Sequence, residues 1–298
     1  QTAMTFRQFL SRLRDIYRPF KGVVAVLFFL LFIKEALMLV GPYIYGKIID
    51  GIITGKSMED VLFLLGISLG AFLVYGIIIS YIRERLELQK FDFDVHRMVS
   101  KSTLEKMLDF SIGQHENQNS GIKKSVIDKG EHSLTALAYS VIYDILPVIL
   151  HVVVAVVALS FLAPILGLVV FVGVIVFLAI AVYINNIIRD DLKKIDDFQH
   201  ETSKKHGEIL RNISLVEANA KEKEVINEYD DQMEKSFDFA KKVWLKFIIF
   251  SHARSLFSNL TKFAVMAIGI YLVYQKVYTP GSLVIFWSWS NSAFNELN

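Results

Sequence analysis

Cysteine is absent from this sequence, and proline occurs only five times in 298 residues. Without cysteine the chain has no disulfide, no zinc site built on thiolates and no cysteine nucleophile. Neither sign of charge predominates, because 32 basic side chains stand against 30 acidic ones. A nucleic-acid-binding protein carries an excess of basic residues on one face, so this balance argues against nucleic acid as a partner.

Long apolar segments dominate the chain, which is 53% hydrophobic with a mean hydropathy of +0.43. Residues 139–162 and 165–188 consist mainly of Val, Ile, Leu, Ala and Phe, and only Ala163 and Pro164 separate them. As a helix each segment is about 36 Å long, enough to cross a hydrocarbon layer of about 30 Å. Proline starts a helix more readily than it continues one, so Pro164 indicates a second helix after a tight turn. The sequence therefore predicts a transmembrane hairpin.

Further apolar segments bring the prediction to six spans in an all-α membrane protein. They cover residues 22–45, 61–82 and 256–274, and the last begins at Gly281. The pair Gly41-Pro42 predicts a kink near the outer end of the first span. From Gly281 to Asn298 a helix is about 27 Å long, so we expect the sixth span to be incomplete at residue 298.

Two polar segments, 83–138 and 189–242, separate spans two from three and four from five. Neither contains proline, so we expect the membrane helices to continue unbroken into water, reaching residues near Phe110 and Glu208. Residues 1–18 predict a short interfacial helix that ends at Pro19, because arginines alternate with an apolar stripe. These arginines precede the first span and predict a cytoplasmic N-terminus, with both polar segments on the same side.

The connection at residues 50–60, predicted as an outer loop, contains Gly55-Lys56-Ser57, which matches the end of a phosphate-binding P-loop. That motif requires a glycine where this chain has Asp50, and a strand before it. No other arrangement of residues indicates catalysis or metal binding. We therefore expect no catalytic residue, no bound cofactor and no metal in this chain.

Several short motifs occur in order along the chain. The first span opens with Arg18-Pro19-Phe20-Lys21 and ends with Pro42, Gly46 and Ile49-Asp50. Gly121 follows the first polar tip, and the second polar segment contains the run 208–218 followed by Lys221–Glu224 and Tyr229. The last span opens with Pro280-Gly281-Ser282-Leu283-Val284. In this order and spacing the motifs resemble the membrane domain of ABC exporters of the half-transporter type.

The resemblance implies a six-helix domain that moves a substrate out of the cytoplasm by alternating access. It also implies that each polar segment carries a coupling helix that binds a nucleotide-binding domain. The implied contact residues are Ser111, Ile112, Gln114, His115, Glu116 and Asn117 in the first segment, and Ile213, Ser214, Leu215, Val216 and Glu217 in the second. The family often has an aromatic residue where this chain has His115, so a more polar contact is implied there.

The resemblance implies partners as well. The sequence contains no Walker A motif, no Leu-Ser-Gly-Gly-Gln signature and no alternation of strands and helices to hold them. We therefore expect this chain not to hydrolyse ATP alone, and ATP and Mg²⁺ to bind nucleotide-binding domains outside it. The other implied partners are membrane lipid and a second copy or a related half-transporter, in the plasma (inner) membrane.

Ionisable and aromatic side chains within the spans are candidates for a substrate cavity. An ionisable group near the bilayer centre costs about 2.5–3.5 kcal/mol, so it normally faces protein or water. We expect at least one of Lys34 and Glu35 to face the bundle, where it lines the cavity or pairs with another span. Asp144 and His151 are seven residues apart and are expected on one helix face. The full candidate set is Lys34, Glu35, Asp144, His151, Lys262 and Trp287, with Lys262 a potential partner for either acid.

Two other functions remain open from the residues alone. One is a secondary transporter or channel that uses Lys34, Glu35 and Asp144 as a proton or ion relay. Such a protein does not need long polar helices outside the membrane. The other is a regulator that shares the exporter fold and transports nothing.

Overall fold

The computed structural model describes residues 14–108 and 120–297, which are almost entirely helical and contain no strand. They divide into two compact units. The first comprises the described residues up to Leu168 together with Val265–Leu297, and the second comprises Val169–Ala264. Each unit is described by itself.

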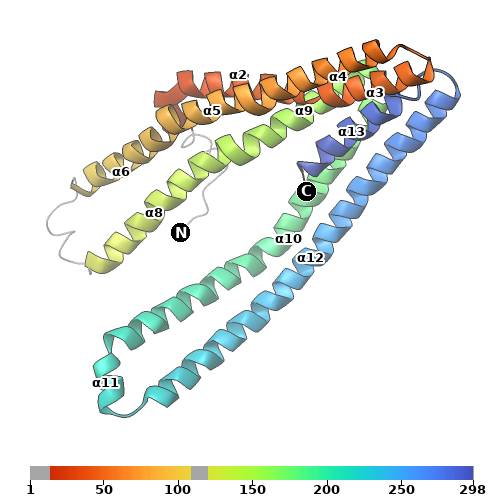
Figure 1. Ribbon diagram of the computed structural model, residues 1–298. Coiled ribbons are helices and arrows are strands. Elements are labelled where there is room, and N and C mark those ends of the chain that lie inside the picture. The colour runs from red at the N-terminus through yellow and green to blue at the C-terminus, as the bar shows by residue number, and fades with distance from the viewer. Residues whose placement is uncertain (1–13, 109–119, 298) are drawn as a thin grey trace. The chain divides into compact units, whose positions relative to one another are not determined.

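The first unit contains most of the helices (Figure 1). Its α-helices are α2 (Lys21–Met38), α3 (Val40–Ile53), α4 (Met58–Leu73), α5 (Ser80–Glu87), α6 (Phe93–Leu108), α8 (Ser120–Ser140), α9 (Leu146–Leu162) and α13 (Ser282–Asn295). The short helix η1 (Arg18–Phe20) is of the 3₁₀ type, and η2 (Val74–Ile79), η3 (Leu88–Asp92) and η4 (Val141–Ile145) are π-helical. The start of α10 (Pro164–Arg211) and the end of α12 (Glu222–Tyr274) also belong to this unit.

Five helical stretches of the described chain are long and apolar enough to cross a membrane. They are Arg14–Ile53, Met58–Glu105, Gly130–Leu162, Pro164–Arg211 and Glu222–Tyr274. Their surfaces carry large exposed apolar side chains, for example Phe63 at 70% and Phe161 at 86% exposure, as expected for groups that face lipid. The predicted sixth span corresponds to α13, which has 14 residues.

The first two spans differ in detail from the prediction. The first span breaks at Leu39, between α2 and α3, because the ring of Pro42 obstructs the carbonyl four residues earlier and the proline has no N–H to donate. The helix then continues to Ile53, so the predicted loop 50–60 shortens to residues 54–57. Within it Gly55 has φ +75°, and the Ser57 hydroxyl caps α4 by accepting from the Asp60 N–H at 3.2 Å. The P-loop-like tripeptide therefore forms a tight turn before α4.

The sequence predicted that the N-terminal helix ends at Pro19, and this prediction is wrong. Pro19 lies in η1, and the helical path runs from Arg14 into α2. This stretch is held against η3 and α8: the Tyr17 ring stacks on Phe91 with 6.0 Å between centroids, and the Tyr17 hydroxyl donates to the Ala138 carbonyl at 2.8 Å. Residues 1–13 of the predicted interfacial helix lie outside the described residues.

The ends of α3 and α13 approach closely. The Asp50 carboxylate accepts hydrogen bonds from the Gly281 N–H at 2.8 Å and the Thr279 hydroxyl at 2.6 Å. A Cβ atom on Gly281 would lie 2.0 Å from the Gly46 carbonyl oxygen, and one on Gly46 would lie 2.6 Å from the Gly281 carbonyl oxygen. Both positions therefore require glycine, because the opposing atoms are backbone.

Pro164 starts α10 directly after α9, as predicted for the hairpin. In the turn a Cβ atom on Gly167 would lie 2.4 Å from the Ser160 Cα, so this glycine lets the two helices reverse within a single residue. Ala163, the residue between them, is 1% exposed.

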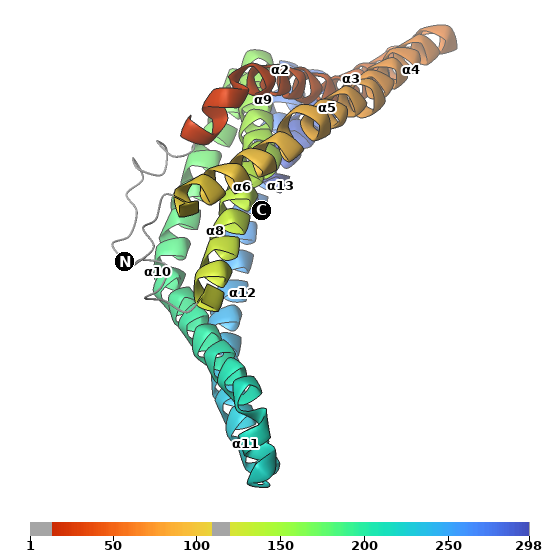
Figure 2. The same ribbon diagram turned by 90° about the vertical axis from the view of Figure 1, so that its left-hand side faces the viewer.

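The second unit is an antiparallel pair formed by the remainder of α10 and α12, which lie side by side in Figures 1 and 2. The short helix α11 (Ile213–Ala218) joins them at the far end. With 48 and 53 residues, α10 and α12 are about 72 and 80 Å long. The helix α10 passes Glu208 without a break, as predicted. The helix that continues from the second span is described as far as Leu108, and it contains the π segment η3.

The close approach of α3 and α13 gives the first testable prediction. Gly281→Ala places a methyl group against backbone and should lower stability by about 1–3 kcal/mol, as overpacking does. The control is Gly66→Ala, where a Cβ meets no atom within 4 Å and alanine favours a helix. We expect the apparent melting temperature in detergent to fall for Gly281→Ala and to stay or rise for Gly66→Ala. Equal melting temperatures for the two variants would contradict the close contact.

Candidate functional site

Three helices of the first unit meet at a buried polar contact. Glu35 on α2 and His151 on α9 are 5% and 4% exposed, and 2.6 Å separates the Glu35 Oε2 from the His151 Nδ1. The other ring nitrogen, Nε2, is hydrogen-bonded to the Ser292 hydroxyl on α13. These three side chains lie 116 and 141 residues apart in sequence and form a continuous bridge across α2, α9 and α13.

The order of these contacts limits the proton positions. With Glu35 ionised, its carboxylate can only accept, and the His151 Nδ1–H is then the donor of this hydrogen bond. The Nε2 atom then accepts from the Ser292 hydroxyl in a neutral ring, or donates to it in a charged ring. Ser–His–acid connectivity also occurs in serine hydrolases, but those enzymes add an oxyanion hole and substrate access. With Glu35 and His151 more than nine-tenths buried, we interpret the contact as a polar bridge between helices.

The other ionisable candidates of the first unit do not join this bridge. Lys34 is half-buried on α2, and no described carboxylate forms an ion pair with it. Asp144 is exposed and accepts from the Ser140 hydroxyl of its own helix at 2.8 Å. Asp144 and His151, which the sequence predicts on one helix face, therefore differ in surroundings: Asp144 is exposed and His151 is buried. Asp144 lies in the π-helical η4, where the wider turn shifts the register before α9 begins.

The π segment itself has a cause in the sequence. Pro147 follows η4 and has no N–H to donate to Tyr143, so the regular hydrogen-bond pattern cannot pass through this point. The Tyr143 hydroxyl is hydrogen-bonded to the Asp92 carboxylate, and the Tyr139 hydroxyl donates to the Asp92 carbonyl at 2.8 Å. Asp92 closes η3, so two π segments meet at this cluster of polar side chains.

The remaining cavity candidates have different surroundings. Trp287 on α13 is 39% exposed, whereas its neighbour Trp289 is 7% exposed and donates from its indole N–H to the Leu39 carbonyl at 3.2 Å. Trp289 fills the space beside the break between α2 and α3. Lys262 is also buried, but it belongs to the second unit. Their roles in a substrate cavity stay predictions.

A small apolar pocket lies next to the polar bridge. Its volume is about 250 Å³, and its walls come from α2, α3, α9 and α13. The lining residues are apolar or aromatic, namely Ala36, Leu39, Val40, Tyr43, Val154, Ala158 and Trp289. Among the described side chains, no group of three or more His, Cys, Asp or Glu is placed to hold a metal ion.

The tip of the second unit is a separate candidate surface. Two asparagines frame α11: the Asn212 side-chain amide donates to the Glu208 carbonyl at 2.9 Å, and that of Asn219 to the Leu215 carbonyl at 2.7 Å. Ala220 then takes φ +51°, a left-handed conformation that turns the chain into α12. Local side-chain bonds and one left-handed residue therefore shape this reversal.

The tip exposes apolar side chains. Ile213 and Leu215 are 49% and 64% exposed, and Val216 is half-buried. Ser214 and Glu217, the other predicted contact residues of this tip, are exposed as well. The first predicted tip, which contains Ser111, Ile112, Gln114, His115, Glu116 and Asn117, lies outside the described residues.

Sequence reasoning missed two participants. Ser292 was not singled out, because a serine in an apolar helix carries no signal of its partner. Asp92 was not singled out either, since it lies among many charged residues of its polar segment. The sequence did contain one signal for the π segment at η4, namely Pro147, because a proline inside a predicted span indicates a local change of helix type.

The polar bridge gives the second prediction. His151→Leu leaves the Glu35 carboxylate buried without its partner, and we expect a loss of about 3 kcal/mol. The double variant Glu35→Leu, His151→Leu removes both polar groups and should recover part of that loss. Apparent melting temperatures in detergent of the single and double variants provide the measurement. A double variant at least as unstable as the sum of the two single variants would show that the two groups do not interact.

The chain was compared with protein families, with curated proteins and with solved structures. The family model of the ABC transporter transmembrane region matches residues 24–297. A solved structure of a bacterial Atm1-family ABC exporter with ATP bound is similar to this chain, with a TM-score of 0.74 and 17% sequence identity. The match covers 93% of this chain and 49% of that one, so the chain spans about half of the exporter's length. No curated protein matches.

The fold is therefore the ABC exporter transmembrane fold, as the order of motifs predicted. The apolar helices and the family match together make the chain a multi-pass integral membrane protein. By the match over residues 24–297, the chain belongs to the family of ABC transporter transmembrane regions.

Proposed function

We propose that this chain is the membrane half of an ATP-driven exporter. It moves a substrate out of the cytoplasm by alternating access, as a dimer with a second copy or a related half-transporter. Nucleotide-binding domains outside this sequence bind ATP and Mg²⁺, and the N-terminus lies in the cytoplasm. The similar exporter was solved with ATP bound, and the family match supports the same class of function here.

The exposed apolar tip is the observation that carries this proposal. Ile213 and Leu215 lie on α11 at the end of a charged two-helix pair, where contact with lipid does not account for exposed apolar side chains. Such exposure in water is typical of a surface that a protein partner covers. The coupling contact accordingly uses Ile213, Ser214, Leu215, Val216 and Glu217, and the predicted first tip supplies a second contact.

The two helices behind the tip are suited to transmit force. The rings of Phe198 and Phe239 lie 5.6 Å apart, and Lys205 forms an ion pair with Glu228 at 2.7 Å. Closer to the apolar part, the Lys246 ammonium lies 3.0 Å from the Asp191 carboxylate. Because contacts recur along the pair, a movement of the tip moves both helices together.

An ion relay receives less support. A relay needs a continuous path of exchangeable groups, but within the described residues neither Lys34 nor Asp144 is hydrogen-bonded to the Glu35–His151–Ser292 bridge. A regulator without transport activity differs from the exporter only in function, so a transport measurement decides between these two.

The third prediction tests the tip in the complete transporter. Ile213→Asp combined with Leu215→Asp places two charges in an apolar contact, where burial of an unpaired charge costs several kcal/mol. We expect ATP-driven transport, and its coupling to ATP hydrolysis, to fall by at least about tenfold. Both side chains are exposed, so the melting temperature should stay unchanged.

The matched control is Ile226→Asp combined with Phe237→Asp. These residues are 64% and 54% exposed on α12, outside the tip, and the change in charge is the same. The control should retain transport. Normal transport by the tip variant, or equal losses in both, would remove the tip from the coupling mechanism.

A further inference from the structure

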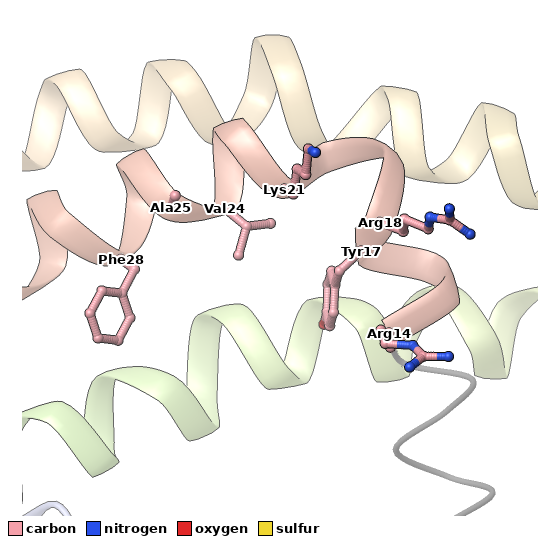
Figure 3. Close-up of a pocket in the computed structure, with 7 residues that line it drawn as sticks. All are labelled: Arg14, Tyr17, Arg18, Lys21, Val24, Ala25 and Phe28. Carbon is pink, nitrogen blue, oxygen red and sulfur yellow. The ribbon is translucent and has the colours of Figure 1, made fainter.

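An open groove runs along the first helical stretch of the chain, and its lining includes no residue of the polar bridge or of the tip. Its volume is about 810 Å³. Figure 3 shows its lining residues, which all come from this one stretch: Arg14, Tyr17, Arg18, Lys21, Val24, Ala25 and Phe28. The proposed transport mechanism assigns no role to this groove.

The lining residues form a stripe with two chemically different ends. Arg14, Arg18, Lys21, Ala25 and Phe28 recur every three or four residues, which is the spacing of one helix face. The stripe is about 21 Å long at the helical rise. Its N-terminal end is cationic and its other end is apolar, and the apolar end belongs to α2 at the start of the first span.

The positive charges at this end have no protein partner in the described structure. Arg14, Arg18 and Lys21 are all exposed, and none forms an ion pair with a described carboxylate. Asp15 is exposed too, but it points about 100° away from Arg14 around the helix. Three adjacent cations without a neutralising group favour an anionic ligand.

Packing behind the groove holds it in shape. Ile16 and Leu27, on the opposite side of the same stretch, are 7% and 2% exposed and belong to a core with Phe91 and Val95. The Tyr17 hydroxyl is bound to the Ala138 carbonyl, so the aromatic wall of the groove is fixed to α8. A site already in shape loses little freedom when a ligand binds.

We propose that the groove binds an anionic phospholipid. The phosphate group contacts Arg14, Arg18 and Lys21, and one acyl chain lies along Val24, Ala25 and Phe28. A soluble anion would use only the cationic end and leave the apolar end exposed. A zwitterionic phospholipid carries its own cation beside the phosphate, which the three basic side chains disfavour.

The fourth prediction measures lipid selectivity. Purified protein is titrated with dioleoylphosphatidylglycerol and with dioleoylphosphatidylcholine, and bound lipid is counted by native mass spectrometry. Each cation near an anionic lipid surface contributes about a fivefold gain in binding. Arg14→Gln, Arg18→Gln and Lys21→Gln together should therefore lower phosphatidylglycerol binding by at least about tenfold, with little effect on phosphatidylcholine.

The matched control neutralises three exposed cations of α10, with Arg189→Gln, Lys193→Gln and Lys194→Gln. The change in net charge is the same, and none of these residues lines the groove. The control should retain phosphatidylglycerol selectivity. An equal loss in both triple variants would overturn the proposal, because general surface charge would then explain the binding.

A separate variant distinguishes a lipid from a free anion. Ala25→Trp fills the apolar end of the groove and leaves all three cations in place. It should weaken phosphatidylglycerol binding about tenfold. Inorganic phosphate should still compete for the three cations as it does in the unchanged protein. If Ala25→Trp binds phosphatidylglycerol normally, the groove holds an anion only and the lipid assignment is wrong. Since Ala25 is exposed, this variant decides the question even if the triple variant fails to fold.

Discussion

Within a bilayer, each backbone N–H and C=O must find its hydrogen-bond partner inside the protein, because lipid offers none. This constraint explains why the described chain is built almost entirely of helices, but it does not require helices as long as α10 and α12, which have 48 and 53 residues. About 20 residues suffice to cross the hydrocarbon layer. The remainder continues beyond it with charged residues on its surface, so the membrane helices themselves provide the long pair that carries α11.

Apolar burial cannot select which helices pair in lipid, because the lipid tails are as apolar as the side chains. Selection in the first unit relies instead on close backbone contact and on polar groups. Gly46 and Gly281 allow α3 to meet α13, and Asp50 binds the Gly281 N–H across 231 residues of sequence. The Glu35–His151–Ser292 bridge links α2, α9 and α13 in the same manner.

Exposed apolar side chains therefore have different meanings in different parts of the chain. On the spans, residues such as Phe63 and Phe161 face lipid, and no protein partner is needed to explain them. At the tip, Ile213 and Leu215 are apolar where the surrounding helices are charged, which indicates a protein partner. In the groove of Arg14 to Phe28, apolar and cationic residues follow one another along one face, which fits a phospholipid.

The sequence by itself determined the membrane class, the hairpin at Pro164, the long proline-free helices and the family, because these depend on local composition, period and motif order. Glu35 and His151 could be singled out, since ionisable groups in a span need partners. The tertiary structure alone decided that they pair with each other and with Ser292, and that Asp144 lies elsewhere. Pairing across 116 and 141 residues depends on which helices meet, and the π segment at η4 changes the register on which sequence spacing relies.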